Sequence, residues 1–239
     1  KTEGYMELNQ FISLDLIKRL RLGIENILSQ GLPPVFCFVY DDYWECVHKL
    51  KGVFKLLLDN KFKMLPDFWA WYINPENSEV GWAPHRDKGP CSISQNGKPK
   101  SLTAWIPITE ANPLNGCMYV VPISKDANYL NNQKQGFHPD LQSIRALPVL
   151  PGDALIWNQA MYHWGGRSSK YSKIPRISVA FEFQRSDVTA FNNPLLDISK
   201  ILPLRVKLGL IGQQILQYKH MYGYSEDLVN IAKKCVANI

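Results

Sequence analysis

Gly81-Trp82-Ala83-Pro84-His85-Arg86-Asp87 is the stretch of this 239-residue chain that decides how the rest is read. Successive side chains of an extended strand point to opposite faces, so His85 and Asp87 share one face and Arg86 lies on the other. An imidazole and a carboxylate side by side need one more ligand to hold a divalent metal. The stretch therefore predicts part of a metal site that is presented by a β-strand.

His163, in Met161-Tyr162-His163-Trp164-Gly165-Gly166, is the candidate for that further ligand. Two histidines and one carboxylate make a facial triad with open positions, which suits non-haem Fe(II) oxygenases. Arg176 follows in Pro175-Arg176-Ile177-Ser178, and a guanidinium there can clamp a second carboxylate with two parallel hydrogen bonds. Together these residues indicate a 2-oxoglutarate-type oxygenase.

Composition favours a single domain over residues 1–239, because no Gly/Ser/Pro-rich linker divides the chain. Aromatic residues make up 12% of it, as in a globular protein with a sizeable core. The formal charge of +6 is mild and the lysines are dispersed, so no nucleic-acid partner is expected. A basic surface would suit an anionic small-molecule substrate.

The five cysteines are odd in number and contain no C-x-x-C pair, which indicates reduced thiols and a cytoplasmic protein. No apolar run reaches the length of a membrane span, and no signal peptide opens the chain. The first residue is Lys rather than Met, as expected for a trimmed chain or for one domain of a longer protein.

The pattern of apolar residues predicts a mainly β core over about 66–185 with helical flanks at 7–60 and 194–237. Helices are expected at 7–30, 41–60, 203–220 and 225–237. Strands are expected at 68–73, 101–108, 117–121, 146–150, 154–157 and 177–183. Asn115-Gly116 predicts a hairpin before 117–121. The polar loops at 88–100 and 124–142 are expected to face the open side of the metal, and the lone His48 and His138 are given no ligand role.

The order of these motifs resembles the phytanoyl-CoA dioxygenase family of Fe(II)/2-oxoglutarate oxygenases, from about Asp67 to Phe183. Besides the triad, the shared pattern comprises Trp105, Asn115-Gly116-Cys117, Val121-Pro122 and Pro151-Gly152-Asp153. His85-Arg86-Asp87 also spells the start of a protein-kinase catalytic loop, but Ser92 stands where that loop needs Asn.

The resemblance implies a double-stranded β-helix (jelly roll, cupin-like) in which His85, Asp87 and His163 hold Fe(II). It implies that Arg176 pairs with the far carboxylate of 2-oxoglutarate. It also implies that the cofactor pocket is lined by Tyr72, Thr103 and Trp105. Ser178 is expected to add a hydroxyl beside Arg176. The chain departs from the family pattern at Pro122-Ile123-Ser124-Lys125, where Pro-Gly-Ser-His is usual, and at Trp164, whose bulk is expected to narrow the site.

The implied reaction is hydroxylation of a small molecule by O2, with release of succinate and CO2. Because Asp87 is present, no ligand position is vacated for a halide, and hydroxylation is favoured over halogenation. Two alternatives stay open from the residues alone. One is a cupin-like hydrolase or isomerase that uses Zn or Mn, with Arg176 as a structural ion-pair partner, and the other is a non-catalytic binding domain.

Overall fold

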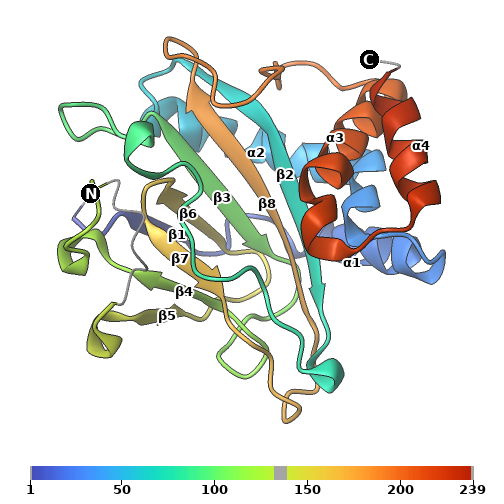
Figure 1. Cartoon of the computed structure of the whole chain (residues 1–239), viewed down its shortest axis with the longest axis horizontal. Helices are drawn as coiled ribbons and strands as arrows, with labels where there is room; N and C mark the ends of the chain where they lie inside the picture. Colours follow the sequence, from blue (N-terminus) through green and yellow to red (C-terminus); the bar gives the residue numbers. More distant parts are fainter. Residues whose placement is uncertain (1, 132–138, 238–239) are drawn as a thin grey trace.

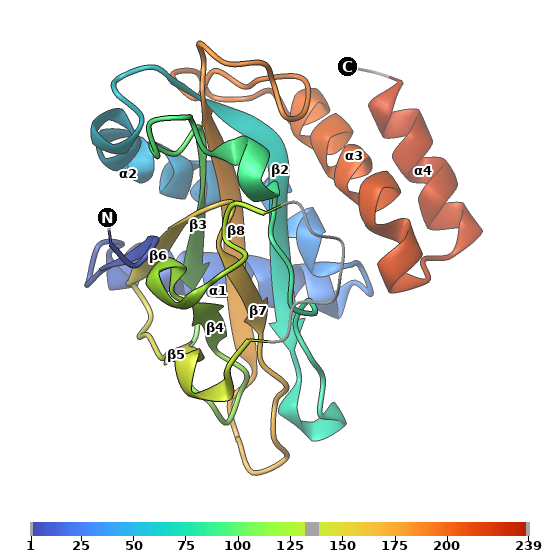
Figure 2. The same cartoon turned by 60° about the vertical axis from the view of Figure 1, so that its left-hand side comes forward.

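Two antiparallel sheets form the body of the computed structural model, which describes residues 2–131 and 139–237 (Figures 1 and 2). The five-stranded sheet has the order β1-β6-β3-β8-β2, and the three-stranded sheet has the order β5-β4-β7. The larger sheet comprises β1 (Tyr5–Leu8), β6 (Ala154–Asn158), β3 (Ser101–Pro107), β8 (Arg176–Arg185) and β2 (Phe62–Ile73). The smaller sheet comprises β5 (Arg145–Leu147), β4 (Met118–Val121) and β7 (Tyr162–Gly165). The mainly β jelly roll with flanking helices is confirmed.

Helices α1 (Leu14–Ser29) and α2 (Asp41–Leu57) cover the back of the large sheet, whereas α3 (Leu204–Tyr222) and α4 (Glu226–Val236) pack beside β2 (Figure 1). In the part of the chain that the structure describes, five short 3-10 helices lie in the connections, at Pro34–Val39, Pro75–Asn77, Gly89–Ser92, Ile123–Lys125 and Leu141–Ser143. Within the described residues, no helix combines the length and apolar character needed to cross a bilayer.

The alternation of side chains along β8 separates a packing face from a site face. Val179 and Phe181 are fully buried in the core that the large sheet shares with the helices. Arg176, Ala180 and Glu182 point the other way, into a cavity between the sheets. The same period places Thr103 and Trp105 of β3 in that cavity, so the central strands carry the core on one side and the site on the other.

Several predicted elements shift in the structure. The helix expected from residue 7 begins at Leu14, where Ser13 accepts the backbone N–H of Leu16 as its N-cap. The residues before it form β1, whose pairing with β6 overrides the helical pattern. Strand β7, which carries His163, was not predicted at all.

The hairpin predicted at Asn115-Gly116 is wrong, because β3 and β4 belong to different sheets. Gly116 does adopt a positive φ of 85°, but the turn serves a crossover between sheets. The buried Asn115 side chain closes that turn by donating to the carbonyl of Glu110 and accepting from the backbone of Asn112. The predicted polar loop at 124–142 falls partly, and His138 wholly, outside the described residues.

Candidate metal and cosubstrate site

His85, Asp87 and His163 meet at one point although they come from distant segments. The chain after β2 pairs with β7 through two backbone hydrogen bonds of 3.0 Å, in which the N–H of each histidine donates to the carbonyl of the other. This pairing sets the two imidazole centroids 4.4 Å apart. One nitrogen or oxygen from each of the three side chains lies within 4.8 Å of the other two, which is the spacing of ligands around a single ion.

Backbone carbonyls fix the orientation of both imidazoles. His85 Nδ1 lies 2.7 Å from the carbonyl oxygen of Ala83, and His163 Nδ1 lies 3.0 Å from that of Met161. A carbonyl can only accept, so each Nδ1 carries the proton and each Nε2 presents a lone pair. Both Nε2 atoms point at Asp87 Oδ1, at 3.3 and 3.4 Å. With both imidazoles neutral, two lone pairs and a carboxylate oxygen face one another, and a cation at their centre would stabilise all three.

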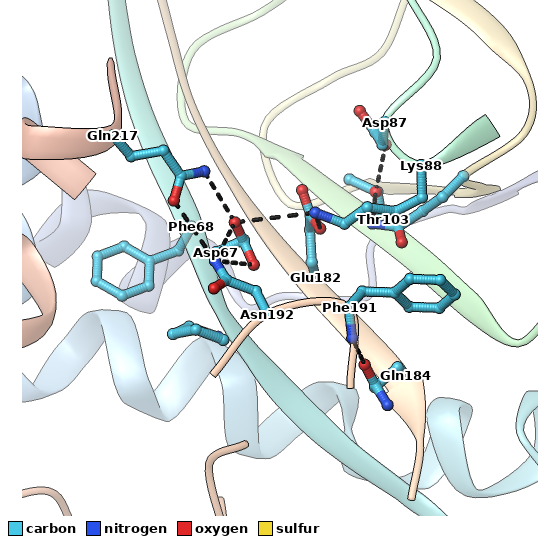
Figure 3. A network of polar contacts seen from close by, with 12 residues as sticks. Asp67, Phe68, Asp87, Lys88, Thr103, Glu182, Gln184, Phe191, Asn192 and Gln217 are labelled. Atoms are coloured by element: carbon cyan, nitrogen blue, oxygen red, sulfur yellow. Dashed lines mark hydrogen bonds and ion pairs between the residues drawn. The ribbon is translucent and has the colours of Figure 1, made fainter. Parts of the chain in front are cut away.

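The other oxygen of Asp87 is held by two donors. Thr103 Oγ1 donates to Asp87 Oδ2 at 2.6 Å (Figure 3). Trp157 Nε1 donates to the same oxygen at 3.2 Å. Gln159 Nε2 donates in turn to Thr103 Oγ1 at 3.0 Å, which fixes the direction of the hydroxyl. Oδ1 is therefore left free to face the two histidines. Outer hydrogen bonds of this kind orient ligands in metal sites.

The charges of the triad are coupled. Burial opposes ionisation of Asp87, but the two imidazoles outweigh it and hold the pKa of that carboxyl well below its usual range. Burial also disfavours the imidazolium of His85, yet its hydrogen bond with Asp87 outweighs this and raises the pKa of His85. The centre of the triad thus favours positive charge, which a proton on an imidazole or a metal ion can supply.

Arg176 lies on the site face of β8 with a side chain that is only 1% exposed. Its Nη1 donates to Ser178 Oγ at 2.7 Å, whereas its buried Nε has no hydrogen-bond partner in the described ranges 2–131 and 139–237. Among the described residues, no carboxylate lies within ion-pair distance of Arg176. Burial lowers the pKa of Arg176 to about 10. A guanidinium buried without an anion is costly, so the arrangement suits an anionic ligand.

Glycines leave room around this guanidinium. A Cβ added at Gly81 would lie 2.9 Å from Arg176 Nη2, and one at Gly165 would lie 3.1 Å from it. Trp105 forms the opposite wall, with its ring centroid 5.8 Å from the Arg176 guanidinium carbon.

The structure brings most of the sequence-predicted residues together. His85, Asp87, His163, Thr103, Trp105 and Arg176 line one cavity. Ser178 shares the face of Arg176 as expected, but it supports the guanidinium from behind and does not line the cavity.

Tyr72 does not line the cavity, and its neighbour Trp71 does. Adjacent residues of a strand face opposite sides, so assigning the pocket position one residue too late along β2 exchanges the two. Trp164 likewise does not narrow the cavity, because it points away from it and stacks on Tyr119, with ring centroids 5.7 Å apart.

Some cavity residues had no signal in the sequence. The described residues of the loops at 88–100 and 124–142 contribute none of the lining. The wall comes instead from β2 and from Tyr218 of α3. Trp157 lies in a strand that the sequence predicted. Its role as a hydrogen-bond donor was not predictable, because the acceptor Asp87 is far away in the sequence.

Solved structures with the same fold are distant in sequence. The epimerase SnoN, in complex with Fe3+, alpha ketoglutarate and nogalamycin RO, is 15% identical with a TM-score of 0.61, over 82% of this chain and 90% of that one. The non-heme monooxygenase ThoJ is 14% identical with a TM-score of 0.65, over 100% and 97%. HygX from Streptomyces hygroscopicus, with nickel and 2-oxoglutarate bound, is 16% identical with a TM-score of 0.58, over 79% and 84%.

Among curated proteins, no sequence relative matches. The family comparison is decisive, because the profile of phytanoyl-CoA dioxygenase (PhyH) matches residues 18–174, well over half of the chain. This span contains the three converging side chains at His85, Asp87 and His163. The chain belongs to the phytanoyl-CoA dioxygenase family.

Proposed function

We propose that the protein is an Fe(II)- and 2-oxoglutarate-dependent dioxygenase that hydroxylates a small molecule with O2 and releases succinate and CO2. His85, Asp87 and His163 would hold the metal through two Nε2 atoms and one carboxylate oxygen. This donor set with open positions suits Fe(II). When bound, the metal and cosubstrate supply the oxidising chemistry, and the protein supplies orientation and shelter from water.

The observation that carries the proposal is the buried, anion-free guanidinium of Arg176. Its orphaned Nε and the space beside Gly81 and Gly165 fit the far carboxylate of a dicarboxylic acid. Ser178 would fix the fork of Arg176 so that it meets that carboxylate with little loss of freedom. The alternative in which Arg176 is a structural ion-pair partner is not favoured, because among the described residues no salt bridge to Arg176 is formed.

Structures that share the fold are described by different reactions, since SnoN is an epimerase and ThoJ a monooxygenase. Hydroxylation is favoured over halogenation because Asp87 keeps its carboxylate at the metal position. A reducing compartment such as the cytoplasm agrees with the free thiols of Cys37, Cys46 and Cys117, all of them buried.

Anaerobic addition of Fe(II) and 2-oxoglutarate to the purified chain tests the proposal. We expect the weak visible charge-transfer band of a chelated complex, and its loss in Asp87→Ala. In air, succinate release should depend on both Fe(II) and 2-oxoglutarate and should rise with substrate. Absence of the band at saturating Fe(II), together with Zn-dependent hydrolysis, would place the hydrolase alternative ahead.

A further inference from the structure

The segment that carries His85 is not part of a regular strand. Residues 78–88 connect two 3-10 helices and meet neighbouring segments only at isolated bridges, one of them between His85 and His163. The His85 imidazole is oriented by the carbonyl of Ala83, a residue that is itself exposed. The orientation of this proposed ligand therefore depends on what holds the chain just before Ala83.

Trp82, immediately before Ala83, packs its ring between β2, α3 and the proposed ligand. Its ring centroid lies 5.3 Å from that of Trp71 in β2 and 4.7 Å from that of Tyr218 in α3. On the other side it lies 5.8 Å from the ring of His85. These rings are packed against one another, so a shift of Trp82 would move the backbone that orients His85.

Tyr222, one turn beyond Tyr218 on α3, holds the polar edge of Trp82. Its hydroxyl accepts the Nε1–H of Trp82 at 2.7 Å and that of Trp69 at 3.0 Å. Ring contacts restrain the plane of an indole, whereas a hydrogen bond to Nε1 also fixes the rotation of the ring within that plane. The Tyr222 hydroxyl thus completes the fixation of Trp82.

Tyr222 does this without being part of the site. In the described part of the chain it is outside the lining of the cavity, and it makes no hydrogen bond with His85, Asp87 or His163. Its helix α3 also lies beyond residues 18–174, the span that carries the family pattern. The contact is therefore a feature of this chain that its family membership does not supply.

We propose that Tyr222 is a positioning residue for the metal site, and that through Trp82 it holds the backbone at Ala83 in the place from which the His85 imidazole is oriented. The C-terminal helix α3 is then a working part of the site. This inference rests on the proposed function, in which His85 is a ligand of the metal. Removal of the phenol hydroxyl loosens His85 without changing any atom of the triad.

The same two hydrogen bonds also attach α3 to β2, so a positioning role has to be separated from a structural one. Tyr43→Phe is the matched control. Tyr43 is fully buried in the core shared with the helices, and its hydroxyl donates to the carbonyl of Leu20. Tyr43→Phe and Tyr222→Phe each remove one phenol hydroxyl with its hydrogen bonding, but only Tyr222 leads to His85.

Calorimetric titration of the full chain with Fe(II) in the absence of O2 measures the effect on the metal. We expect Tyr222→Phe to weaken Fe(II) binding about tenfold, the lower end of the loss when an outer partner of a metal ligand is deleted. Tyr43→Phe should bind Fe(II) like the unaltered chain. The visible spectrum of the Co(II)-loaded protein reports ligand geometry, and it should shift in Tyr222→Phe but not in Tyr43→Phe.

Trp82→Phe, which keeps a ring but lacks the indole N–H, tests whether the effect passes through this bond. We expect it to weaken Fe(II) binding as Tyr222→Phe does. The double variant should be no weaker than either single variant, because two changes that break one interaction are not additive. Fully additive losses would mean that Tyr222 does not act through Trp82.

Hydrogen exchange of the metal-free chain tests the positioning apart from the metal. We expect peptides covering residues 82–87 to exchange faster in Tyr222→Phe than in the unaltered chain or in Tyr43→Phe, because the bridge between His85 and His163 opens more often. Circular dichroism of each variant checks that it is folded.

An unchanged Fe(II) affinity in folded Tyr222→Phe would overturn the inference, as would equal losses in Tyr222→Phe and Tyr43→Phe. Tyr222 would then serve only to pack α3. If the unaltered chain binds neither Fe(II) nor Co(II), the proposed function fails and hydrogen exchange decides separately. Faster exchange at 82–87 in Tyr222→Phe would still support Tyr222 as the residue that positions His85, and unchanged exchange would overturn it.

Discussion

Thr103 donates its hydroxyl proton to Asp87 Oδ2 over 2.6 Å, and this bond decides which oxygen of Asp87 faces the two histidines. Trp157 adds a second donor to the same oxygen at 3.2 Å. With Oδ2 occupied, Oδ1 is the oxygen directed at both Nε2 atoms. A side chain outside the triad therefore sets the proposed coordination of the metal.

Thr103→Val removes that donor while keeping the shape of the side chain. We expect Fe(II) affinity to fall about 10- to 100-fold, the usual loss when a partner of a metal ligand is deleted. Anaerobic calorimetric titration with Fe(II) measures it. Thr103→Ser keeps the hydroxyl and should stay within a few-fold of the unaltered chain. Equal affinities in the Val and Ser variants would mean that the bond does not orient Asp87.

Arg86, between the two proposed ligands, has a structural task. Its guanidinium lies 2.7 Å from Asp126 Oδ2, whose side chain is fully buried, and it also donates to the carbonyl of Ala160. Arg86→Ala leaves the Asp126 charge buried without this partner, so we expect the free energy of unfolding to fall by about 3–5 kcal/mol. Urea unfolding measures the loss.

Fe(II) affinity of the folded Arg86→Ala fraction should change far less than that of Asp87→Ala, because Arg86 faces away from the triad. Arg86→Lys retains a charge for Asp126 and serves as the control for stability. Loss of metal binding in Arg86→Ala but not in Asp87→Ala would reverse the assignment of the two side chains.

Arg176→Lys keeps the charge at the proposed cosubstrate position but loses the fork. A charge-assisted hydrogen bond is worth about 1.5–3 kcal/mol, or roughly ten- to more than a hundred-fold in affinity. We expect the KM for 2-oxoglutarate to rise by about one order of magnitude in Arg176→Lys and by more in Arg176→Ala.

Pyruvate is the control ligand for these variants, because it has the keto acid group but no far carboxylate. Its binding to the Fe(II) protein should be nearly the same in all three forms, as should the affinity for Fe(II) alone. If activity depends on 2-oxoglutarate concentration in the same way in both variants and in the unaltered chain, Arg176 is not in the cosubstrate site. The hydrolase alternative is then favoured.

The fold and the members of the triad were predictable from the sequence because they depend on local periods and ordered motifs. The strand predicted at 81–87 is wrong, since this stretch makes only an isolated bridge between His85 and His163. His85 and Asp87 are two residues apart, and strands β3, β6 and β8 each show a short apolar run. The aromatic lining that Trp69, Trp82 and Tyr218 give to the cavity was not predictable. Trp82 meets Tyr222 across 140 residues of chain, and that contact exists only because α3 packs beside β2.

The predictions for the residues of strand β1 and for the hairpin at Asn115-Gly116 were wrong for the same reason. Tyr5–Leu8 has little strand character alone and is extended because β6 offers it an open edge. Asn115-Gly116 encodes a turn but not the sheet to which the next strand belongs. Local sequence favours a backbone conformation, whereas the packing of the whole core determines which strands pair.

Cysteine labelling tests the burial of the thiols. Burial raises the pKa of Cys117 to about 11 and that of Cys46 to about 12. Raised values mean that almost no thiolate is present at pH 8, and the thiolate is the reactive form. We expect iodoacetamide at that pH to modify the exposed Cys91 first, with Cys117 and Cys46 slower by at least about two orders of magnitude.

Peptide mass spectrometry resolves the sites, and labelling in urea shows that all the thiols can react. Comparable rates for Cys91 and Cys117 in the folded protein would contradict the burial of Cys117.

Gly81→Ala tests whether the space beside Arg176 matters. An added methyl group would meet Gly165 Cα at 2.8 Å and Arg176 Nη2 at 2.9 Å, distances that backbone and a buried guanidinium can relieve only by moving. We expect 2-oxoglutarate affinity in the presence of Fe(II) to fall about tenfold or more, equivalent to at least about 1.4 kcal/mol, together with a lower Tm.

The matched control is Gly52→Ala in α2, where an added Cβ meets nothing within 4 Å. There the lower conformational freedom of alanine in a helix should raise stability by about 0.5–1 kcal/mol and leave 2-oxoglutarate binding unchanged. Calorimetric titration with 2-oxoglutarate and thermal unfolding of both variants measure the contrast. If Gly81→Ala binds 2-oxoglutarate like the unaltered chain, the far carboxylate does not lie between Gly81, Gly165 and Arg176.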